Sequence, residues 1–164
     1  MPASKPHAPR IKKDIFLTAE GATRLRAELE DLRGPRRDEL ARRLRHAVQQ
    51  GDLSENADYI SAKEEQGFLE GRIQELEETL RQAQIVEGDV PTGEVGVGTT
   101  VVIQEEGQGP QIYQIVGAKE ADPRHGRISH ESPIGMALMG KRPGEEAVAR
   151  TPAGEIRMRV VEIR

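Results

Sequence analysis

The sequence predicts a protein of mixed α+β class, in which an N-terminal antiparallel coiled-coil hairpin is followed by a small α+β domain. Three observations lead to this prediction. Apolar residues recur in steps of three and four through the first half of the chain, 32% of the residues are charged, and glycine, proline and short β-branched runs replace the helical pattern near residue 90. With only two tyrosines and two phenylalanines, the chain favours a narrow apolar helical seam over a thick aromatic core.

Residues 1–13 are expected to form a disordered extension, because the first ten contain three prolines and no apolar run. The same segment does not have the pattern of a signal peptide. The chain also lacks a stretch of about eighteen consecutive apolar residues. It contains no cysteine, which excludes a disulfide framework and a thiolate metal site and fits a reducing compartment. We therefore expect a soluble, cytoplasmic protein.

The first helix is expected to begin at Thr18, which is a good N-cap residue. Gly34 and Pro35 interrupt its pattern. Since proline lacks a backbone donor and crowds the preceding turn, we expect a kink there, with the helix resuming at Arg36. The apolar seam of this helix consists of Leu25, Leu29, Leu32, Leu40, Leu44 and either Ala47 or Val48.

The second helix repeats the same rhythm, although Gly67 and Gly71 each weaken it by about 1 kcal/mol relative to alanine. Its seam consists of Ala62, Leu69, Ile73, Leu76, Leu80 and Ala83. The two helices should fold back on each other, because neither can bury its apolar stripe alone. We therefore expect a hairpin over residues 14–87, with helices of about 30 residues that reach on the order of 45 Å. Its tip would stand far from any globular body.

The character of the chain changes after the hairpin. Residues 88–93 are expected to be a linker, and residues 94–164 a domain of short strands separated by turn sequences such as "EEGQGP" and "TPAG". Ser132 and Pro133 resemble an N-cap and a first helical position, which predicts a short helix before Gly140. The strands are predicted at residues 100–104, 111–117, 126–130, 145–150 and 155–163.

The predicted tip, "QQGDLSENADY", places Asp52 and Glu55 three residues apart. One interpretation is a capping box, in which Asp52 caps the second helix and Glu55 reaches back to it. From spacing alone this interpretation is favoured, because helix caps outnumber active residues wherever helices begin. The alternative is that two ionised carboxylates at an exposed tip bind Mg²⁺. Two carboxylates alone hold Mg²⁺ poorly, so a partner would have to supply the missing ligands.

A basic strip precedes the tip on the first helix, at Arg36, Arg37, Arg42, Arg43 and Arg45. It is interpreted first as a solvated helical face whose i,i+4 pairs favour solubility. The alternative is a strip that holds a nucleic-acid backbone close to the tip. A net charge of −4 excludes general electrostatic binding of nucleic acid by the whole protein, so any such contact must be local.

Other motifs do not point to chemistry of the chain's own. The segment "VGVGTT" lacks the third glycine and the following helix of a phosphate loop. The four histidines have no metal-ligand spacing, and neither Ser54 nor Ser132 has a histidine at motif spacing. No nucleophile is found with its base.

Four segments resemble the bacterial Gre transcript cleavage factors, most closely those of the A type: "LTAEGATRLRAELEDL", "GDLSENADYISAKEEQGFLEGRI", "ISHESPIGMALMGK" and "TPAGE". The likeness covers about residues 14–164, and the tip is its most specific part. It implies an FKBP-like fold for residues 94–164, which would bind bacterial RNA polymerase at the rim of the secondary channel. The hairpin would then point inward and stimulate the polymerase's own cleavage of backtracked RNA.

The same resemblance implies roles for individual residues. Asp52 and Glu55 match the acidic pair that family members use to help hold the second Mg²⁺ of the polymerase, so the chain would have no cofactor of its own. Glu131, Ser132 and Pro133 fall in the segment through which relatives contact the polymerase. The 3′ end of the nascent RNA in backtracked complexes would be a further partner. A self-satisfied seam favours a monomer.

Departures from the family pattern refine this expectation. The residues before the tip, "AVQQ", lack the charged residue that many relatives carry there, and the basic strip is modest beside that of the B type. We therefore expect action on short backtracked RNAs. The unaltered "GDLSEN" argues against an inhibitory relative with a changed tip.

Two alternatives come from other functional classes. The first is a family paralogue or coiled-coil adaptor that occupies the polymerase channel without stimulating cleavage. The second is a prolyl isomerase, which the FKBP-like fold suggests. The isomerase is disfavoured because that chemistry needs an aromatic-lined pocket, and Tyr113 is the only aromatic residue after residue 90.

Overall fold

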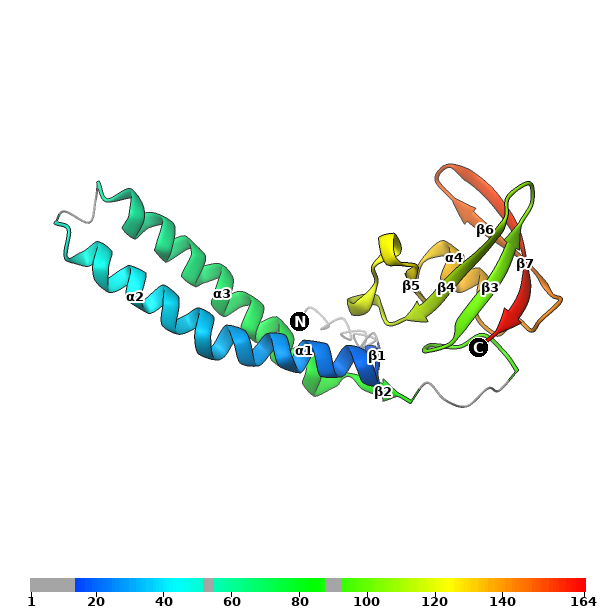
Figure 1. The fold of residues 1–164 in the computed structure, drawn as a ribbon, viewed down its shortest axis with the longest axis horizontal. Helices are drawn as coiled ribbons and strands as arrows, with labels where there is room; N and C mark the ends of the chain where they lie inside the picture. Colours follow the sequence, from blue (N-terminus) through cyan, green and yellow to red (C-terminus); the bar gives the residue numbers. More distant parts are fainter. Residues whose placement is uncertain (1–13, 52–54, 88–92) are drawn as a thin grey trace, which may run out of the picture.

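The computed structural model describes residues 14–51, 55–87 and 93–164, which form a long helical hairpin and a separate sheet domain (Figure 1). The predicted extension at residues 1–13 and nearly all of the predicted linker lie outside the described residues. The hairpin projects from the sheet domain, and its tip is the part farthest from that domain. The predicted α+β class is confirmed. Within the described residues, no helix is long and apolar enough to cross a membrane.

The first half of the hairpin is helical almost throughout. Thr18 caps α1 as predicted, because its Oγ1 accepts a hydrogen bond from the Gly21 amide at 3.0 Å. At the position of the expected kink, the chain forms a π-helical turn that includes Pro35, and it stays helical through that turn. A wider turn accommodates the missing proline donor at low cost. The elements in order are β1 (Phe16–Thr18), α1 (Ala19–Asp31), the π-turn (Leu32–Arg36) and α2 (Arg37–Val48).

The return helix, α3 (Ala57–Gln82), packs against both α1 and α2. The predicted seam is confirmed: Leu29, Ile73 and Leu76 form its buried centre, and Leu25, Leu32, Leu69 and Leu80 pack around it. Of the two candidates near the tip, Ala47 lies in the seam at 2% exposure, whereas Val48 is 51% exposed. The seam stays narrow because the helix surfaces on either side carry charged side chains.

A short parallel strand pair closes the base of the hairpin. β1 pairs with β2 (Gln84–Val86), with Phe16 opposite Gln84 and Thr18 opposite Val86. This pair is not predicted from the sequence, since runs of three residues show no periodicity. The pair joins the two ends of the hairpin beside the sheet domain, where Leu17 is fully buried.

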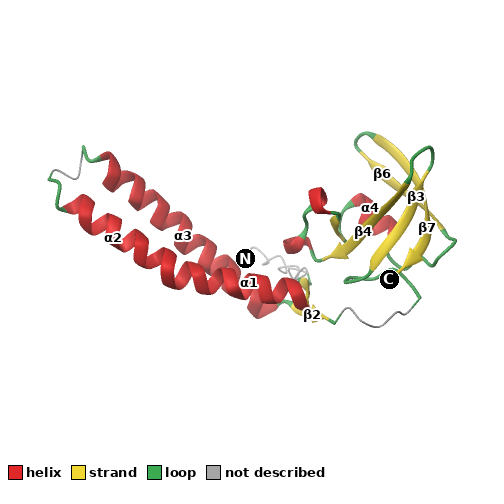
Figure 2. Cartoon of the chain, viewed as in Figure 1, coloured by secondary structure: helices red, strands yellow, loops and turns green. Residues whose placement is uncertain are grey.

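The sheet domain contains a five-stranded sheet in the order β5-β4-β3-β7-β6, and its five strands and short helix match the predicted elements (Figure 2). All neighbours are antiparallel except β4 and β5. Ser132 caps α4 as predicted. The core includes Val101, Ile103, Ile115, Leu138 and Val160. The elements are β3 (Thr100–Glu105), β4 (Pro110–Val116), two 3₁₀ turns (Ala118–Glu120 and Pro123–His125), β5 (Arg127–Ser129), α4 (Pro133–Leu138), β6 (Glu146–Thr151) and β7 (Gly154–Ile163).

Candidate functional site at the hairpin tip

The tip connects the end of α2 to the start of α3. Gly51 has a φ of +114°, a value that favours glycine, and it directs the chain out of the first helix. Asp52 follows it and lies outside the described residues. Glu55 is described and its side chain is exposed. Of the predicted acidic pair, the structure therefore places one member, on the outermost surface of the hairpin.

The capping-box interpretation of the tip is wrong. The N-cap of α3 is Asn56, whose Oδ1 accepts a hydrogen bond from the Tyr59 amide at 3.1 Å. Glu55 precedes the cap, so it cannot occupy the third helical position that a capping box requires. Aspartate and asparagine are comparable caps, and local sequence alone does not choose between Asp52 and Asn56. Glu55 thus has no capping role in this fold.

Asn56 also connects the two helices. Its Nδ2 donates a hydrogen bond at 2.8 Å to the Ala47 carbonyl, which also accepts from the Gln50 amide at 3.2 Å in the last turn of α2. One side chain therefore bonds both the end of α2 and the start of α3. Asn56 is not among the residues predicted from the sequence, although an asparagine three residues before Tyr59, at the start of a periodic run, was a usable sign.

Small side chains accompany this bridge. Ala47 on α2 is 2% exposed and Ala62 on α3 is fully buried. Alanine at such positions lets two helices approach closely, which keeps the end of the hairpin thin. Within the described residues, the end of α2 and the start of α3 are therefore held together by packing and by Asn56, and no contact of the Glu55 carboxylate contributes.

The described part of the tip can supply a metal ligand to a partner, but it does not form a complete metal site. Among the described residues, no group of three or more histidine, aspartate or glutamate side chains could hold a metal ion. The carboxylate of Glu55 is an oxygen donor of the kind that Mg²⁺ prefers, and it is exposed to a partner. The residues present fit Mg²⁺ only if other ligands come from elsewhere.

Two of the five predicted RNA-contacting arginines bind across the hairpin. Arg37 makes a bidentate contact with Glu70, with Nε to Oε1 at 3.0 Å and Nη2 to Oε2 at 2.8 Å. Arg43 pairs with Glu65, which lies on α3 like Glu70. The side chains of Arg37 and Arg43 are 45% and 46% exposed, so each pair stabilises the hairpin by at most about 1 kcal/mol.

The remaining arginines of the strip are less engaged. Arg36 approaches Glu39 one turn away at 3.6 Å. Within the described part of the chain, Arg42 and Arg45 have no ion-pair partner, and both are exposed. The strip thus divides into residues that hold the hairpin together and residues that are available to a ligand.

The predicted polymerase-binding segment forms a rigid turn between β5 and α4. The Ser132 hydroxyl donates to the Ser129 carbonyl at 2.7 Å and accepts from the Gly135 amide at 3.0 Å. A Cβ added at Gly135 would lie 2.0 Å from the Ser129 carbonyl oxygen. Ser132 therefore orders the turn, Glu131 beside it is half-buried, and Pro133 is exposed.

An exposed methionine adjoins this turn and was missed by the sequence analysis. Met136 on α4 is 61% exposed. Such a side chain is flexible and polarizable, which suits an adaptable contact with another protein. Its position three residues after Pro133 was the sign available in the sequence, since i and i+3 share a helix face.

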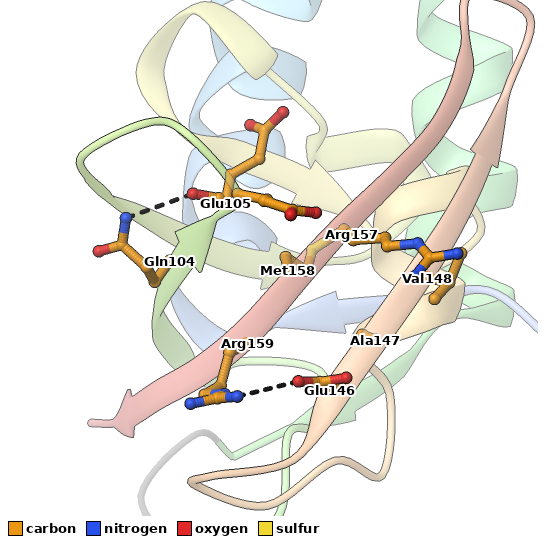
Figure 3. Close-up of a pocket in the computed structure, with 9 residues that line it drawn as sticks. Gln104, Glu105, Glu146, Ala147, Val148, Arg157, Met158 and Arg159 are labelled. Atoms are coloured by element: carbon orange, nitrogen blue, oxygen red, sulfur yellow. Dashed lines mark hydrogen bonds and ion pairs between the residues drawn. The ribbon is translucent and has the colours of Figure 1, made fainter.

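A shallow cavity of about 420 Å³ lies on the sheet domain, over β3, β6 and β7 (Figure 3). Arg159 and Glu146 pair across it at 2.9 Å. Its lining residues are Gln104, Glu105, Glu106, Glu146, Ala147, Val148, Arg157, Met158 and Arg159. None of these is aromatic and Tyr113 is not among them, so this cavity does not resemble the aromatic pocket that a prolyl isomerase needs.

Comparison with known proteins places both parts of the chain in one family. Residues 15–85 match the family described as "Transcription elongation factor, N-terminal", and residues 90–164 match "Transcription elongation factor, GreA/GreB, C-term". The chain is similar to transcription elongation factor GreA of Bacillus subtilis strain 168, with 47% identity over 93% of this chain and 98% of the relative. It is 45% identical to the GreA of Caldanaerobacter subterraneus subsp. tengcongensis, over 94% of this chain and 99% of that one.

A solved structure is also similar. The crystal structure of GreA factor homolog 1 of Thermus thermophilus is 33% identical, covers 93% of this chain and 99% of its own, and has a TM-score of 0.42. The sequence relatives and the two family matches together span the hairpin and the sheet domain. The chain therefore belongs to the GreA/GreB family of transcription elongation factors and is of the GreA type.

Proposed function

We propose that this elongation factor binds bacterial RNA polymerase at the rim of the secondary channel and stimulates the polymerase's own cleavage of backtracked RNA. The sheet domain docks on the rim and the hairpin enters the channel. The observation that carries the proposal is the exposed carboxylate of Glu55, which lies at the end of a long thin hairpin and, among the described residues, makes no hydrogen bond or ion pair.

The hairpin is built to carry such a group over a distance. Three kinds of contact join its two helical halves. They are the apolar seam, the ion pairs of Arg37 and Arg43, and the hydrogen bond from Asn56 to Ala47. The π-turn avoids a break at Pro35. At 1.5 Å per residue, the 26 residues of α3 span about 39 Å. A stiff arm of this length can bring a carboxylate into a site that a globular surface could not reach.

The chemistry proposed for the tip is ligand donation. Asp52 and Glu55 would supply carboxylate oxygens to the second Mg²⁺ of the polymerase, and the chain has no cofactor of its own. When bound, that ion would activate water and stabilise the attacking and leaving oxygens of an in-line displacement. The carboxylates of the factor only complete the coordination, so the factor is an activator and the polymerase is the enzyme.

The contact with the polymerase rim is assigned to the turn of Glu131, Ser132 and Pro133, extended by Met136. The internal hydrogen bonds of Ser132 keep the backbone of this turn fixed before binding. Preorganisation of this kind lowers the entropic cost of association. Pro133 and Met136 then supply exposed apolar surface at its edge.

The 3′ end of the RNA is a further partner in the proposal, with Arg42 and Arg45 as its best-placed contacts and Arg36 beside them. Charge reversal of Arg42 and Arg45 should weaken crosslinking of the RNA 3′ end to the factor, whereas reversal of Arg26, exposed near the base, should not. Equal crosslinking by the parent and both variants would show that the basic strip is only a solvated helical face. The factor is proposed to act as a cytoplasmic monomer.

The decisive experiment uses stalled, backtracked polymerase and measures RNA shortening with Asp52→Ala combined with Glu55→Ala. We expect retained polymerase binding and lost cleavage. The matched control combines Glu30→Ala with Glu64→Ala, which removes the same charge from exposed positions on the arm. An adaptor that merely occupies the channel would show the same activity with both double variants, and that result would exclude the proposed role of the tip.

A further inference from the structure

The base of the hairpin contains a buried carboxylate that the proposed function does not use. Glu120 belongs to the first 3₁₀ turn of the sheet domain, yet only 6% of it is exposed. Its Oε2 accepts from the Thr18 amide at 2.7 Å, and its Oε1 accepts from the Thr18 hydroxyl at 2.6 Å. Removing a carboxylate from water costs free energy, and hydrogen bonds to its two oxygens offset that cost.

These bonds connect the sheet domain to the start of α1. The Thr18 hydroxyl donates to Glu120 and accepts from the Gly21 amide, so the carboxylate sits at the positive end of the helix through its cap residue. Arg24, one turn further along, places Nη2 at 3.6 Å from Oε1. The orientation of the helix axis is thereby tied to the position of one side chain of the other domain.

Two glycines allow the domains to approach this closely. A Cβ added at Gly21 of the hairpin would lie 1.8 Å from Oε1 of Glu120. A Cβ added at Gly117 of the sheet domain would lie 1.7 Å from the Phe16 carbonyl oxygen. At Gly117 the neighbour is backbone, so a larger residue there must move the two domains apart. At Gly21 the neighbour is the Glu120 side chain, so a larger residue there must displace that carboxylate from Thr18.

Further contacts surround this centre. Lys119, next to Glu120, pairs with Glu75 of α3, with Nζ to Oε1 at 2.8 Å. The same 3₁₀ turn therefore contacts both α1 and α3. The rings of Phe16 and His130 meet edge to face, with centroids 5.4 Å apart. The connection is therefore a packed joint with several independent contacts.

We infer that Thr18, Gly21, Gly117 and Glu120 form an arm joint that sets the direction of the hairpin relative to the sheet domain, and that Glu120 is a positioning residue for the tip. This inference rests on the proposed cleavage-stimulating function. A rotation of about 10° at the base would move the end of a 39 Å arm by about 7 Å. Because Mg²⁺ accepts ligands only at about 2.0–2.1 Å, so large a movement removes the tip from its target.

The geometric test uses the protein in isolation. Because the chain has no cysteine, Ser61→Cys on the arm and Ala153→Cys on the β6–β7 turn provide two unique sites for a donor and an acceptor dye. We expect Gly21→Ala to shift or broaden the distribution of energy transfer. Gly71→Ala is the matched control, because a Cβ there meets nothing within 4 Å, and its distribution should equal that of the parent.

A second substitution distinguishes a joint from general damage. Glu120→Ala alone should also shift or broaden the distribution, because it removes the acceptor of both Thr18 donors. In the double variant the effects of Glu120→Ala and Gly21→Ala should not add, because the new methyl then has no carboxylate to displace. Contacting residues are expected to show such coupling, whereas independent damage adds. Circular dichroism confirms that each variant is folded.

The activity test separates aim from docking. At saturating concentrations, Gly21→Ala should lower the maximal rate of RNA cleavage by at least about tenfold while polymerase binding changes little, because small misplacements at a reacting centre are costly. An unaltered distance distribution, or an altered one with the parental maximal rate, would overturn the inference. If the unmodified factor does not stimulate cleavage, the proposed function is wrong. The energy-transfer measurement alone then decides whether the joint sets the direction of the hairpin.

Discussion

The two ends of the hairpin use carboxylates in opposite ways. At the base, Glu120 is buried and accepts hydrogen bonds from both donors of Thr18. At the tip, Glu55 is exposed, and the cap of α3 is supplied by Asn56. A bonded, buried carboxylate is part of the framework, whereas an exposed carboxylate without a structural duty is available to a partner. This contrast predicts that removing Glu55 affects activity alone and that removing Glu120 affects stability as well.

The largest expected effect breaks the tip. Glu55→Ala should reduce stimulated RNA cleavage by about 100-fold, which corresponds to about 2.7 kcal/mol of activation free energy. Its thermal midpoint should equal that of the parent, because the side chain bonds nothing in the cap. Cleavage of a backtracked complex and a melting curve measure the two quantities. A lowered midpoint would show that Glu55 supports the turn after all.

The next effect breaks the base. Glu120→Ala leaves the amide and hydroxyl of Thr18 without their acceptor in a buried place, so we expect a loss of about 2 kcal/mol in the free energy of unfolding. Denaturant titration measures it. Glu20→Ala, an exposed carboxylate in the first turn of α1, is the control and should cost far less. Equal losses would mean that burial of Glu120 contributes nothing specific.

The bridge between the helices gives a smaller change. Asn56→Ala removes the N-cap of α3 and the donor to Ala47, and should lower the free energy of unfolding by about 1 kcal/mol. Asn56→Asp keeps the capping oxygen and loses only the donor, so it should lie between alanine and the parent. Chemical denaturation of the three proteins orders them. If aspartate and alanine were equally destabilised, the cap would have no part in the effect.

The pairs along the arm should contribute less still. In a double-mutant cycle, Arg37→Ala and Glu70→Ala should show a coupling of about 0.5 kcal/mol, because water reaches nearly half of each side chain. Since salt screens such pairs, the coupling should shrink as ionic strength rises. Unfolding free energies at low and high salt provide the measurement. A coupling that ignored salt would contradict the electrostatic explanation.

The smallest effect is a dependence on pH near the joint. Hydrogen bonds from Lys119 and Arg72 hold the pKa of Glu75 below its ordinary value of 4.5. A lowered pKa in the folded state means that the stabilisation is fully present above the unfolded value and is lost as the pH falls toward the folded value. The difference in unfolding free energy between the parent and Glu75→Gln should therefore be constant from pH 6 to about pH 5 and shrink below the ordinary pKa. A difference that grew on acidification would reverse the sign of the argument.

Sequence reasoning succeeded where the responsible interaction is local. The steps of three and four identified the seam, and the cap residues Thr18 and Ser132 marked the starts of α1 and α4. Alternation and turn residues likewise located the five strands of the sheet domain. Such patterns are readable because the chain repeats its own geometry every few residues.

The same reasoning failed where two local solutions compete. Asp52 and Asn56 are both acceptable caps, and the choice is associated with a hydrogen bond from Asn56 to Ala47 on the opposite helix. The functional assignment of Asp52 came from the resemblance of the tip, and it stays a prediction because that residue lies outside the described ones. The division of the arginine strip likewise depended on glutamates of α3, which helical spacing within α2 could not reveal.

By itself, the sequence determined that two seamed helices form a hairpin, that a small sheet domain follows, and that an acidic motif lies at the turn. Only the tertiary structure decided which helix partner each arginine takes, which residue caps α3, and how the arm meets the sheet domain. The physical reason is separation along the chain. Helical periods and caps involve neighbours within four residues, whereas Thr18 and Glu120 are 102 residues apart and meet only when both domains have folded.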